Sequence, residues 1–284
     1  MLRGRIDWNF LGTALALAAI GCMLVYSATR FGADRPLFQK QVLWTSIGIV
    51  LMVIFVAVDY HALLEMSPFL YAAGVGLLAY LLLWGRLTRN VRSWIHIGTF
   101  QFQPSEFVKI FTALVVAKFF DSNERAYLTF RNFVLVALII LGPAFLIAIQ
   151  PAFGSAATFV PLLAVAMFFG GIKLRYWLAM ILVCLIIAPV GWHFLKPFQK
   201  ERIMIFLDPA RDPLGSGYQV MQAKIATGSG GIHGKGFLQG TQVNLEYLPA
   251  RHTDFIFSVL GEEWGFVGVI IVLTLYLYLI VQAL

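Results

Sequence analysis

The sequence predicts an all-α, polytopic transmembrane helix bundle that carries one long polar loop. Sixty per cent of its 284 residues are hydrophobic and 12% are charged, and the mean hydropathy is +0.82. A soluble chain of this length needs more polar surface to cover its core, so lipid must solvate much of this one. Apolar runs of membrane-spanning length also recur along the chain. We therefore expect a single transmembrane domain over residues 1–284, with a long loop at residues 196–254.

Eight segments are predicted to cross the membrane, because about 20 apolar residues traverse roughly 30 Å of hydrocarbon. The charge-free run between Asn132 and Ile172 is too long for one helix, and the QPAFG sequence at Gln150 to Gly154 divides it, since proline and glycine interrupt helices. The fourth span is the least apolar. The predicted spans are Trp8 to Thr29, Gln41 to Val58, Met66 to Gly85, 105–120, 133–149, 155–171, Tyr176 to Leu195 and Trp264 to Leu284.

The charge distribution narrows the class of ligand. The formal net charge is +7, which indicates a basic face toward anionic lipid headgroups or phosphate-bearing substrates. No long basic run or basic helix lies outside the apolar segments, so nucleic acid is not an expected partner. With a cytoplasmic N-terminus, the short outside loops hold almost as many cations as the inside ones, contrary to the positive-inside rule. An anionic ligand on the outside would explain these cations, which are Arg30, Arg35, Lys40, Arg86, Arg89 and Arg92.

Two further features concern the apolar segments. Cys22 and Cys184 both lie inside apolar runs, where we interpret them as small hydrophobic residues rather than as reactive thiols. The chain ends at Leu284 in the middle of an apolar run, with no polar tail. We therefore expect a C-terminal truncation.

The long loop differs sharply in composition from the rest of the chain. Between Lys196 and Asp254 it holds twelve charged side chains, and eight glycines fall between Gly215 and Gly240, notably in TGSGGIHGKGFLQG. Loops of this length are usually functional or disordered, and interleaved aromatic residues favour a folded loop. A glycine-rich segment can bring backbone N–H groups to a phosphate. Turn formation is the other interpretation, and without a Walker or Rossmann pattern the residues alone favour it.

Asp254 ends this loop and begins the last span. From the residues alone, an N-terminal helix cap is the favoured interpretation, because the dipole and unpaired N–H groups attract a carboxylate. His252 is either a base or a hydrogen-bonded bystander. Glu262 and Glu263 follow Asp254 by eight and nine residues, which is roughly 12–13 Å along a helix. Because a carboxylate at such depth is costly in lipid, we expect both to face the bundle interior or a cavity.

A second charged motif lies in the fourth span. In QPSEFVKI, Glu106 and Lys109 are three residues apart, so they share one helix face and can pair. The pair either neutralises two charges inside the bundle or takes part in substrate binding, and the two roles are compatible.

These motifs together resemble one known family. SWIHIGTFQFQPSEFVKI, the QPxFG turn and GSGGIHGKGFLQGTQVNLEYLPARHTDFIFSVLGEEWGF are similar to the SEDS proteins of shape, elongation, division and sporulation, a family that includes RodA, FtsW and SpoVE. The LPARHTDFIFS stretch resembles RodA more than FtsW. The resemblance runs from the first span to the end of the chain, and the loop motif carries it.

The resemblance implies an activity and a setting. Proteins of this family are peptidoglycan glycosyltransferases that polymerise lipid II at the outer face of the bacterial cytoplasmic membrane. They work with a class B penicillin-binding protein and have ten transmembrane helices, with the long loop outside. A lipid II flippase, or a scaffold for the penicillin-binding protein, is the alternative. Intramembrane carboxylates would suit a transporter, but the concentration of charge and glycine in one outside loop favours chemistry at the membrane surface.

The resemblance also implies roles for individual residues. Asp254 matches the essential loop aspartate, either as the general base for an acceptor hydroxyl or as the ligand of a divalent cation such as magnesium or manganese. Glu106 and Lys109 match a buried ion pair, and Trp94 matches an outer-loop tryptophan that contacts partner or lipid. Our further candidates for substrate binding are Arg202, Lys224, Lys235, His252 and Glu262.

One position departs from the family pattern. The turn usually reads QPDFG, but Ala152 stands here in place of the aspartate. Alanine neither binds metal nor accepts a proton. If the missing carboxylate supports catalysis, Ala152→Asp should raise activity.

Overall fold

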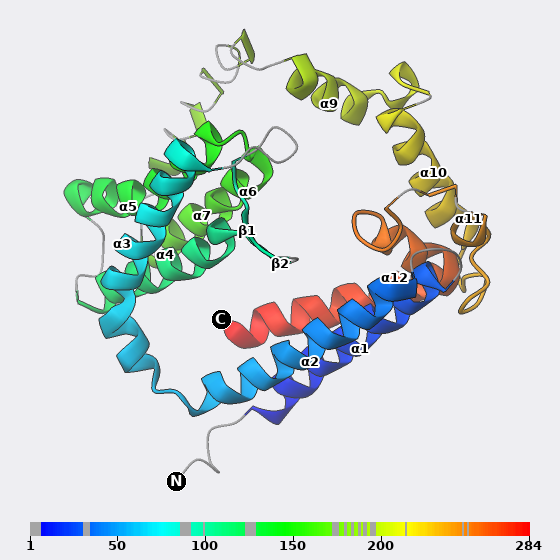
Figure 1. Cartoon of the computed structure of the whole chain (residues 1–284), viewed down its shortest axis with the longest axis horizontal. Coiled ribbons are helices and arrows are strands. Elements are labelled where there is room, and N and C mark those ends of the chain that lie inside the picture. The colour runs from blue at the N-terminus through cyan, green and yellow to red at the C-terminus, as the bar shows by residue number, and fades with distance from the viewer. Residues whose placement is uncertain are drawn as a thin grey trace. The chain divides into compact units, whose positions relative to one another are not determined.

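The computed structural model shown in Figure 1 describes most of the chain. Its residues belong to two compact units, one built from residues 1–54 and 190–284 and the other from residues 55–189. Helices dominate both units, which confirms the predicted all-α class. The described residues are 7–30, 35–85, 92–98, 100–122, 129–171, 176–178, 181–182, 185–186, 189, 192–193, 197–213, 215–245, 247–248 and 250–284.

Seven of the eight predicted spans coincide with helices. Five of these helices are long and apolar enough to cross a membrane: α1 (Trp8–Thr29), α2 (Arg35–Ala57), α3 (Tyr60–Trp84), α5 (Phe130–Ile149) and α12 (Ile256–Ala283). The fourth span is α4 (Pro104–Asp121), and the sixth is divided into α6 (Phe153–Ala157) and α7 (Phe159–Phe169). Half of the seventh, Tyr176 to Leu195, lies outside the described residues.

The unit of residues 55–189 contains α3 to α7 around an apolar core. Leu78, Val108, Ile140, Ile147 and Phe159 are each at most 1% exposed. Gly74 permits the close approach of α3 to α4, because a Cβ at this position would lie 2.8 Å from Val108 Cγ2. Before α4, a short hairpin pairs β1 (Ile95–Ile97) with antiparallel β2 (Phe100–Phe102).

The other unit joins the N-terminal helices to the C-terminal third of the chain. The predicted long loop is folded, as its aromatic residues indicated, into α9 (Pro197–Leu207), a 3₁₀ turn at Pro209–Arg211, α10 (Ser216–Ser229) and α11 (Thr241–Asn244). Helix α12 lies against both α1 and α10 (Figure 1). The core of this unit includes Leu24 of α1 and Val259 and Leu260 of α12.

The last helix is longer than its charge-free part, which starts at Trp264. It begins at Ile256, two residues after Asp254, so that Glu262 and Glu263 lie within it, as the position of Asp254 at the start of the last span predicted. Its backbone is interrupted at Gly265, where φ is 66° and ψ is −163°. This break, together with the glycine-rich segment that contacts it, forms the inner part of the candidate site.

Candidate functional site

Asp254 lies in the turn that leads into α12, and its side chain is exposed. The N-cap position of α12 belongs to Phe255, which makes no side-chain cap hydrogen bond. Asp254 makes no hydrogen bond with any residue that the structure describes. The interpretation of Asp254 as a helix cap is therefore wrong, because the helix starts one residue too late for it. Its carboxylate faces solvent and is available to a substrate.

The segment around Asp254 is nevertheless held in place from both sides by the end of α1. On one side, the buried Arg251 donates from Nε to the carbonyl oxygen of Ala28 at 2.7 Å. On the other side, the hydroxyl of Ser27 donates to Oε1 of Glu263. Consecutive residues of α1 thus anchor the chain before and after Asp254. An exposed carboxylate on a fixed segment is the arrangement that a catalytic group requires.

Glu262 is completely buried and is the centre of a polar cluster. Its Oε1 accepts from Lys235 Nζ at 2.7 Å, from Thr241 Oγ1 at 3.0 Å and from the N–H of Gln242 at 3.0 Å. A buried carboxylate needs such compensation, because the loss of hydration is costly. As predicted, both glutamates face the interior. Lys235, a predicted substrate contact, is instead engaged by Glu262.

The glycine-rich segment packs against the break in α12. The N–H groups of Lys235 and Gly236 donate to the carbonyl oxygens of Glu262 and Glu263, each at 2.9 Å, and the N–H of Phe266 donates back to Gly231 O at 2.9 Å. These bonds satisfy α12 backbone groups that the interruption would otherwise leave unpaired.

This close packing is why the segment contains glycine. A Cβ on Gly234 would lie 2.1 Å from Glu263 O, and Gly234 also has a φ of +78°. The N–H groups of residues 234–236 all have backbone acceptors. Of the two interpretations of this segment, turn formation and close approach therefore fit the structure, whereas these three N–H groups are already occupied and do not form a phosphate cradle.

The remaining candidates of this unit differ in their surroundings. His252 is partly buried, and its Nδ1 has no hydrogen-bond partner among the described residues. Lys224 is exposed on α10. Arg202 belongs to α9, but its side chain lies outside the described part of the structure.

In the unit of residues 55–189, the predicted pair between Glu106 and Lys109 is confirmed. Lys109 Nζ lies 2.8 Å from Glu106 Oε2 in the first turns of α4. The pair is less buried than the family resemblance implied, because the side chain of Glu106 is 52% exposed and that of Lys109 is 26% exposed. The pair is therefore not enclosed within the unit of residues 55–189.

The QPAFG turn is connected to the segment that leads into the hairpin of β1 and β2. The buried Gln150 receives a hydrogen bond from Ser93 Oγ at 3.3 Å and donates to Leu78 O at 2.8 Å. Trp94, next to Ser93, is partly buried. Ala152 occupies the N-cap position of α6 without a side-chain hydrogen bond. The predicted helix break at this turn is confirmed, since α5 ends at Ile149 and α6 begins at Phe153.

Three residues help to build the site but were not predicted from the sequence to do so: Ser27, Thr241 and Arg251. Ser27 is one hydroxyl in an apolar helix, and its partner Glu263 is 236 residues away. The one local signal was Arg251 itself, a cation three residues before Asp254 whose burial no local pattern indicates.

Comparisons with known proteins agree with this architecture. The family model of the FtsW, RodA and SpoVE cell cycle proteins matches residues 7–284. The peptidoglycan glycosyltransferase MrdB of Escherichia coli is 37% identical over 282 residues, which cover 99% of this chain and 75% of MrdB. The peptidoglycan glycosyltransferase RodA of Treponema pallidum is 31% identical over 360 residues, covering all of this chain and 83% of that protein.

Solved structures show the same fold. A chain of a peptidoglycan synthase complex, described in terms of polymerization and crosslinking, aligns with a TM-score of 0.79 at 32% identity, covering 97% of this chain and 76% of its own length. RodA of Thermus thermophilus, a rod shape determining protein, aligns with a TM-score of 0.66 at 27% identity, covering 97% of this chain and 73% of that protein. The chain therefore belongs to the FtsW/RodA/SpoVE family of cell cycle proteins, the SEDS family that its loop motif predicts.

Proposed function

We propose that Asp254 is the catalytic carboxylate of a peptidoglycan glycosyltransferase that polymerises lipid II for cell-wall elongation and rod shape. The enzyme class follows from the family, because relatives that align with nearly the whole chain are peptidoglycan glycosyltransferases. The observation that carries the role of Asp254 is its combination of an exposed carboxylate with a segment anchored by Arg251 and Glu263.

The proposed reaction needs one proton acceptor. The acceptor hydroxyl oxygen bonds to the anomeric carbon of the lipid-linked donor, and the bond from that carbon to the pyrophosphate oxygen breaks. Asp254 takes the hydroxyl proton, and the polyprenyl pyrophosphate leaves with the electron pair. Because pyrophosphate is a good leaving group, deprotonation and stabilisation of the departing charge are the main tasks of the protein.

Cations for the departing pyrophosphate come from the exposed part of the long loop. Lys224 on α10 is exposed, and Arg202 on α9 is the second candidate. Lys235 fits this role less well, because its ammonium group is bonded to Glu262 and Thr241. Both glutamates of α12 are assigned to holding the site together rather than to contacting the substrate. The half-exposed pair of Glu106 and Lys109 stays a candidate for substrate binding.

A divalent cation, magnesium or manganese, is part of this proposal in a limited form. The described residues contain no group of three or more His, Cys, Asp or Glu side chains that could hold a metal. Magnesium is commonly bound by one or two carboxylates together with substrate phosphates. The residues present fit a cation that Asp254 shares with the donor pyrophosphate, where it would stabilise negative charge, and do not fit a cage built by protein alone.

The setting of the reaction is the bacterial inner membrane, in which the protein is multi-pass. We place the loop of residues 196–254 on the outer face, where lipid II and a crosslinking partner of the class B penicillin-binding type would meet it. Trp94 is the proposed contact for this partner or for lipid. The likeness to a chain of a peptidoglycan synthase complex supports a partnered enzyme.

The experiment is lipid II polymerisation by the purified protein with its partner, comparing the wild type with Asp254→Ala. Asp208→Ala is the matched control, because Asp208 is also an exposed carboxylate of the long loop. We expect glycan strands from the wild type and the control but none from Asp254→Ala. Strands from all three would remove Asp254 from catalysis. Movement of labelled lipid II across vesicles without any polymer would instead support the flippase.

A further inference from the structure

The glycine-rich segment runs alongside α12 in a fixed register. The N–H of Phe266 donates to Gly231 O at 2.9 Å, and that of Val267 donates to Ile232 O at 3.1 Å. These bonds set the height of the segment along α12. We call residues 231–234 the tip, because they are the part of the segment that reaches furthest along the helix. Ile232 of the tip therefore lies level with Val267.

Helices α1 and α12 together mark where the hydrocarbon of the membrane ends. At one end of the pair, Gln282 of α12 donates to Asp7, the N-cap residue of α1, at 2.6 Å. At the other end, Ser27 of α1 donates to Glu263 of α12. At 1.5 Å per residue, these two polar contacts are roughly 30 Å apart along α1 and roughly 29 Å apart along α12. This separation equals the thickness of the hydrocarbon core, so the two contacts lie at its two boundaries.

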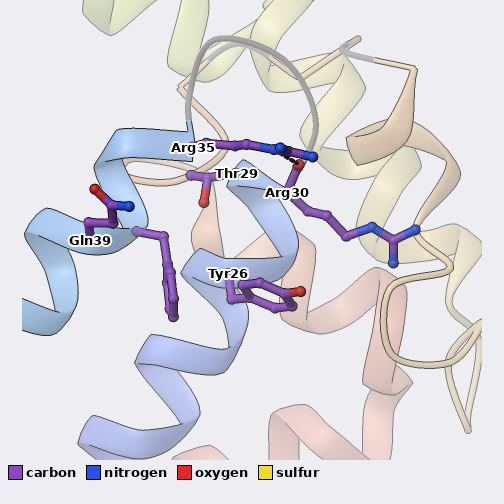
Figure 2. A pocket seen from close by; sticks show the side chains of 6 residues that line it. Tyr26, Thr29, Arg30, Arg35 and Gln39 are labelled. Atoms are coloured by element: carbon purple, nitrogen blue, oxygen red, sulfur yellow. Dashed lines mark hydrogen bonds between the residues drawn. The ribbon is translucent and has the colours of Figure 1, made fainter.

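Two arginines support the position of the boundary at Ser27. Figure 2 shows Arg30, which directly follows α1, next to Arg35 at the start of α2. The Nε of Arg35 donates to the carbonyl oxygen of Arg30 at 3.1 Å. Arginine at the end of a membrane span extends its charge to the level of the lipid headgroups. The hydrocarbon therefore ends just inside Arg30, at the contact between Ser27 and Glu263.

The tip lies on the hydrocarbon side of this boundary. Val267 is roughly 6 Å further into the membrane than Glu263 along α12, and Ile232 is level with Val267. A tilt of α12 would move the boundary toward Asp254 and place the tip deeper. Ile232 is 65% exposed, and its neighbour Phe266 on α12 is 61% exposed. Contact with acyl chains in place of water stabilises an isoleucine side chain by about 1.5–3 kcal/mol.

The backbone of the segment is suited to this depth, because hydrocarbon tolerates irregular backbone only where the protein pairs its polar groups. The N–H groups of residues 231, 234, 235 and 236 all have backbone acceptors, and the carbonyl oxygens of residues 230, 231 and 232 all accept backbone hydrogen bonds. The ammonium group of Lys235 is bonded to Glu262 and Thr241. His233 is exposed beside Ile232, and its ring combines an apolar body with a polar edge.

We propose that the tip inserts into the bilayer and contacts the acyl chains of the leaflet on the side of Asp254. The glycine-rich segment is then a re-entrant part of the membrane domain rather than an external loop. The length of α12 from Glu263 back to its first residue, Ile256, is roughly 10 Å. The inserted tip would therefore hold Asp254 about that far above the hydrocarbon. Lipid is favoured over a helix of another protein, because the exposed side chain of Ile232 continues the exposed apolar surface of α12.

The test measures the depth of the tip in a bilayer and needs no catalysis. Cys22→Ser and Cys184→Ser remove the native thiols, and Ile232→Cys then carries a nitroxide spin label in the full-length protein. The protein is reconstituted in phosphatidylethanolamine and phosphatidylglycerol, and power saturation compares collisions with oxygen, which concentrates in hydrocarbon, and with a water-soluble nickel chelate. The label at residue 232 should collide mainly with oxygen, at a depth of roughly 6 Å inside the hydrocarbon edge.

Met221→Cys is the matched control. Met221 is also an exposed apolar residue of this unit, but it lies on α10 roughly 9 Å further from the tip than Thr227, which contacts α12 at Gly261. Its label should collide mainly with the chelate, whereas a label at Ile270→Cys, which is exposed on α12 below the boundary, should behave like that at residue 232.

Two results would overturn the proposal. A label at residue 232 that matches the one at residue 221 would place the tip in water. A label at residue 232 that is sheltered from both reagents would show that protein covers the tip, as a helix of another protein would. All variants should elute as the same monodisperse species, and neither result would bear on the role of Asp254.

Discussion

Removing the ammonium group of Lys235 should release the glycine-rich segment from α12. Lys235→Met keeps most of the apolar side chain but leaves Glu262, which is 0% exposed, without its cation. Breaking a buried pair from one side costs about 3–5 kcal/mol. Glu262 keeps the hydrogen bonds from Thr241 and Gln242, so we take the lower end. About 3 kcal/mol corresponds to roughly a hundredfold shift in a local opening equilibrium.

Hydrogen exchange followed by mass spectrometry measures this opening directly. The amides of residues 235 and 236 donate to the carbonyls of Glu262 and Glu263, so their exchange reports whether the segment is docked. Lys235→Met should speed exchange of these amides by about a hundredfold. The double variant with Glu262→Gln should recover most of the protection, because it no longer buries an unpaired charge.

Lys224→Met is the control, since Lys224 is exposed on α10 and its side chain makes no hydrogen bond to a described residue. It should leave the exchange at residues 235 and 236 unchanged. Equal protection in Lys235→Met and the wild type would refute the reasoning that the ion pair holds the segment. Equal loss in Lys224→Met would show that the effect is one of net charge rather than of this contact.

Three further changes test other contacts. Ser27→Ala leaves a buried oxygen of Glu263 without its donor, so thermal unfolding should show a loss of about 1–3 kcal/mol; an unchanged midpoint would contradict the anchor. Gly234→Ala should release the glycine-rich segment from α12, because its Cβ would lie 2.1 Å from a backbone oxygen. Gly228→Ala is the control, since a Cβ there would meet nothing within 4 Å. Protease should cleave the segment faster in Gly234→Ala than in Gly228→Ala, and equal cleavage would contradict the close packing. Ala152→Asp should cap α6 and add about 1 kcal/mol of stability, with higher polymerisation; no change in either would end the case for this carboxylate.

Hydropathy was sufficient to predict most helices, because each membrane span is a continuous run of apolar residues that can be recognised without knowing its contacts. It placed seven spans on helices and divided the run at Gln150 correctly. Hydropathy alone began the last span at Trp264, because a charge-free window cannot contain Glu262 and Glu263, whereas the position of Asp254 already placed both glutamates within the last span. Their charges are accommodated inside by Lys235, 27 residues earlier, and by Ser27, 236 residues earlier. Pairing over such separations has no signature in a local window.

In the candidate site, too, local patterns were predictable and contacts between distant residues were not. The spacing of Glu106 and Lys109 predicted their pair because both residues lie on one helix, but not the half-exposure of Glu106, which depends on packing. The position of Asp254 before an apolar run suggested a helix cap, a local rule that fails here because the chain turns once more before α12. Glycine content alone left two interpretations of the segment, and the contacts with α12 distinguish them.

The most direct test of the central claim is the single-turnover rate of glycosyl transfer by Asp254→Asn, with lipid II saturating and the partner present. Asparagine keeps the shape of the side chain, and because Asp254 is exposed and makes no bond to a described residue, the fold should be unchanged. Saturating lipid II keeps the donor bound if a cation shared with its pyrophosphate is lost. If Asp254 is the proton acceptor, the rate should fall by about 10²–10⁴-fold, the usual contribution of a general base. A rate equal to that of the wild type, with binding intact, would contradict the assignment and place the proton acceptor elsewhere in the protein.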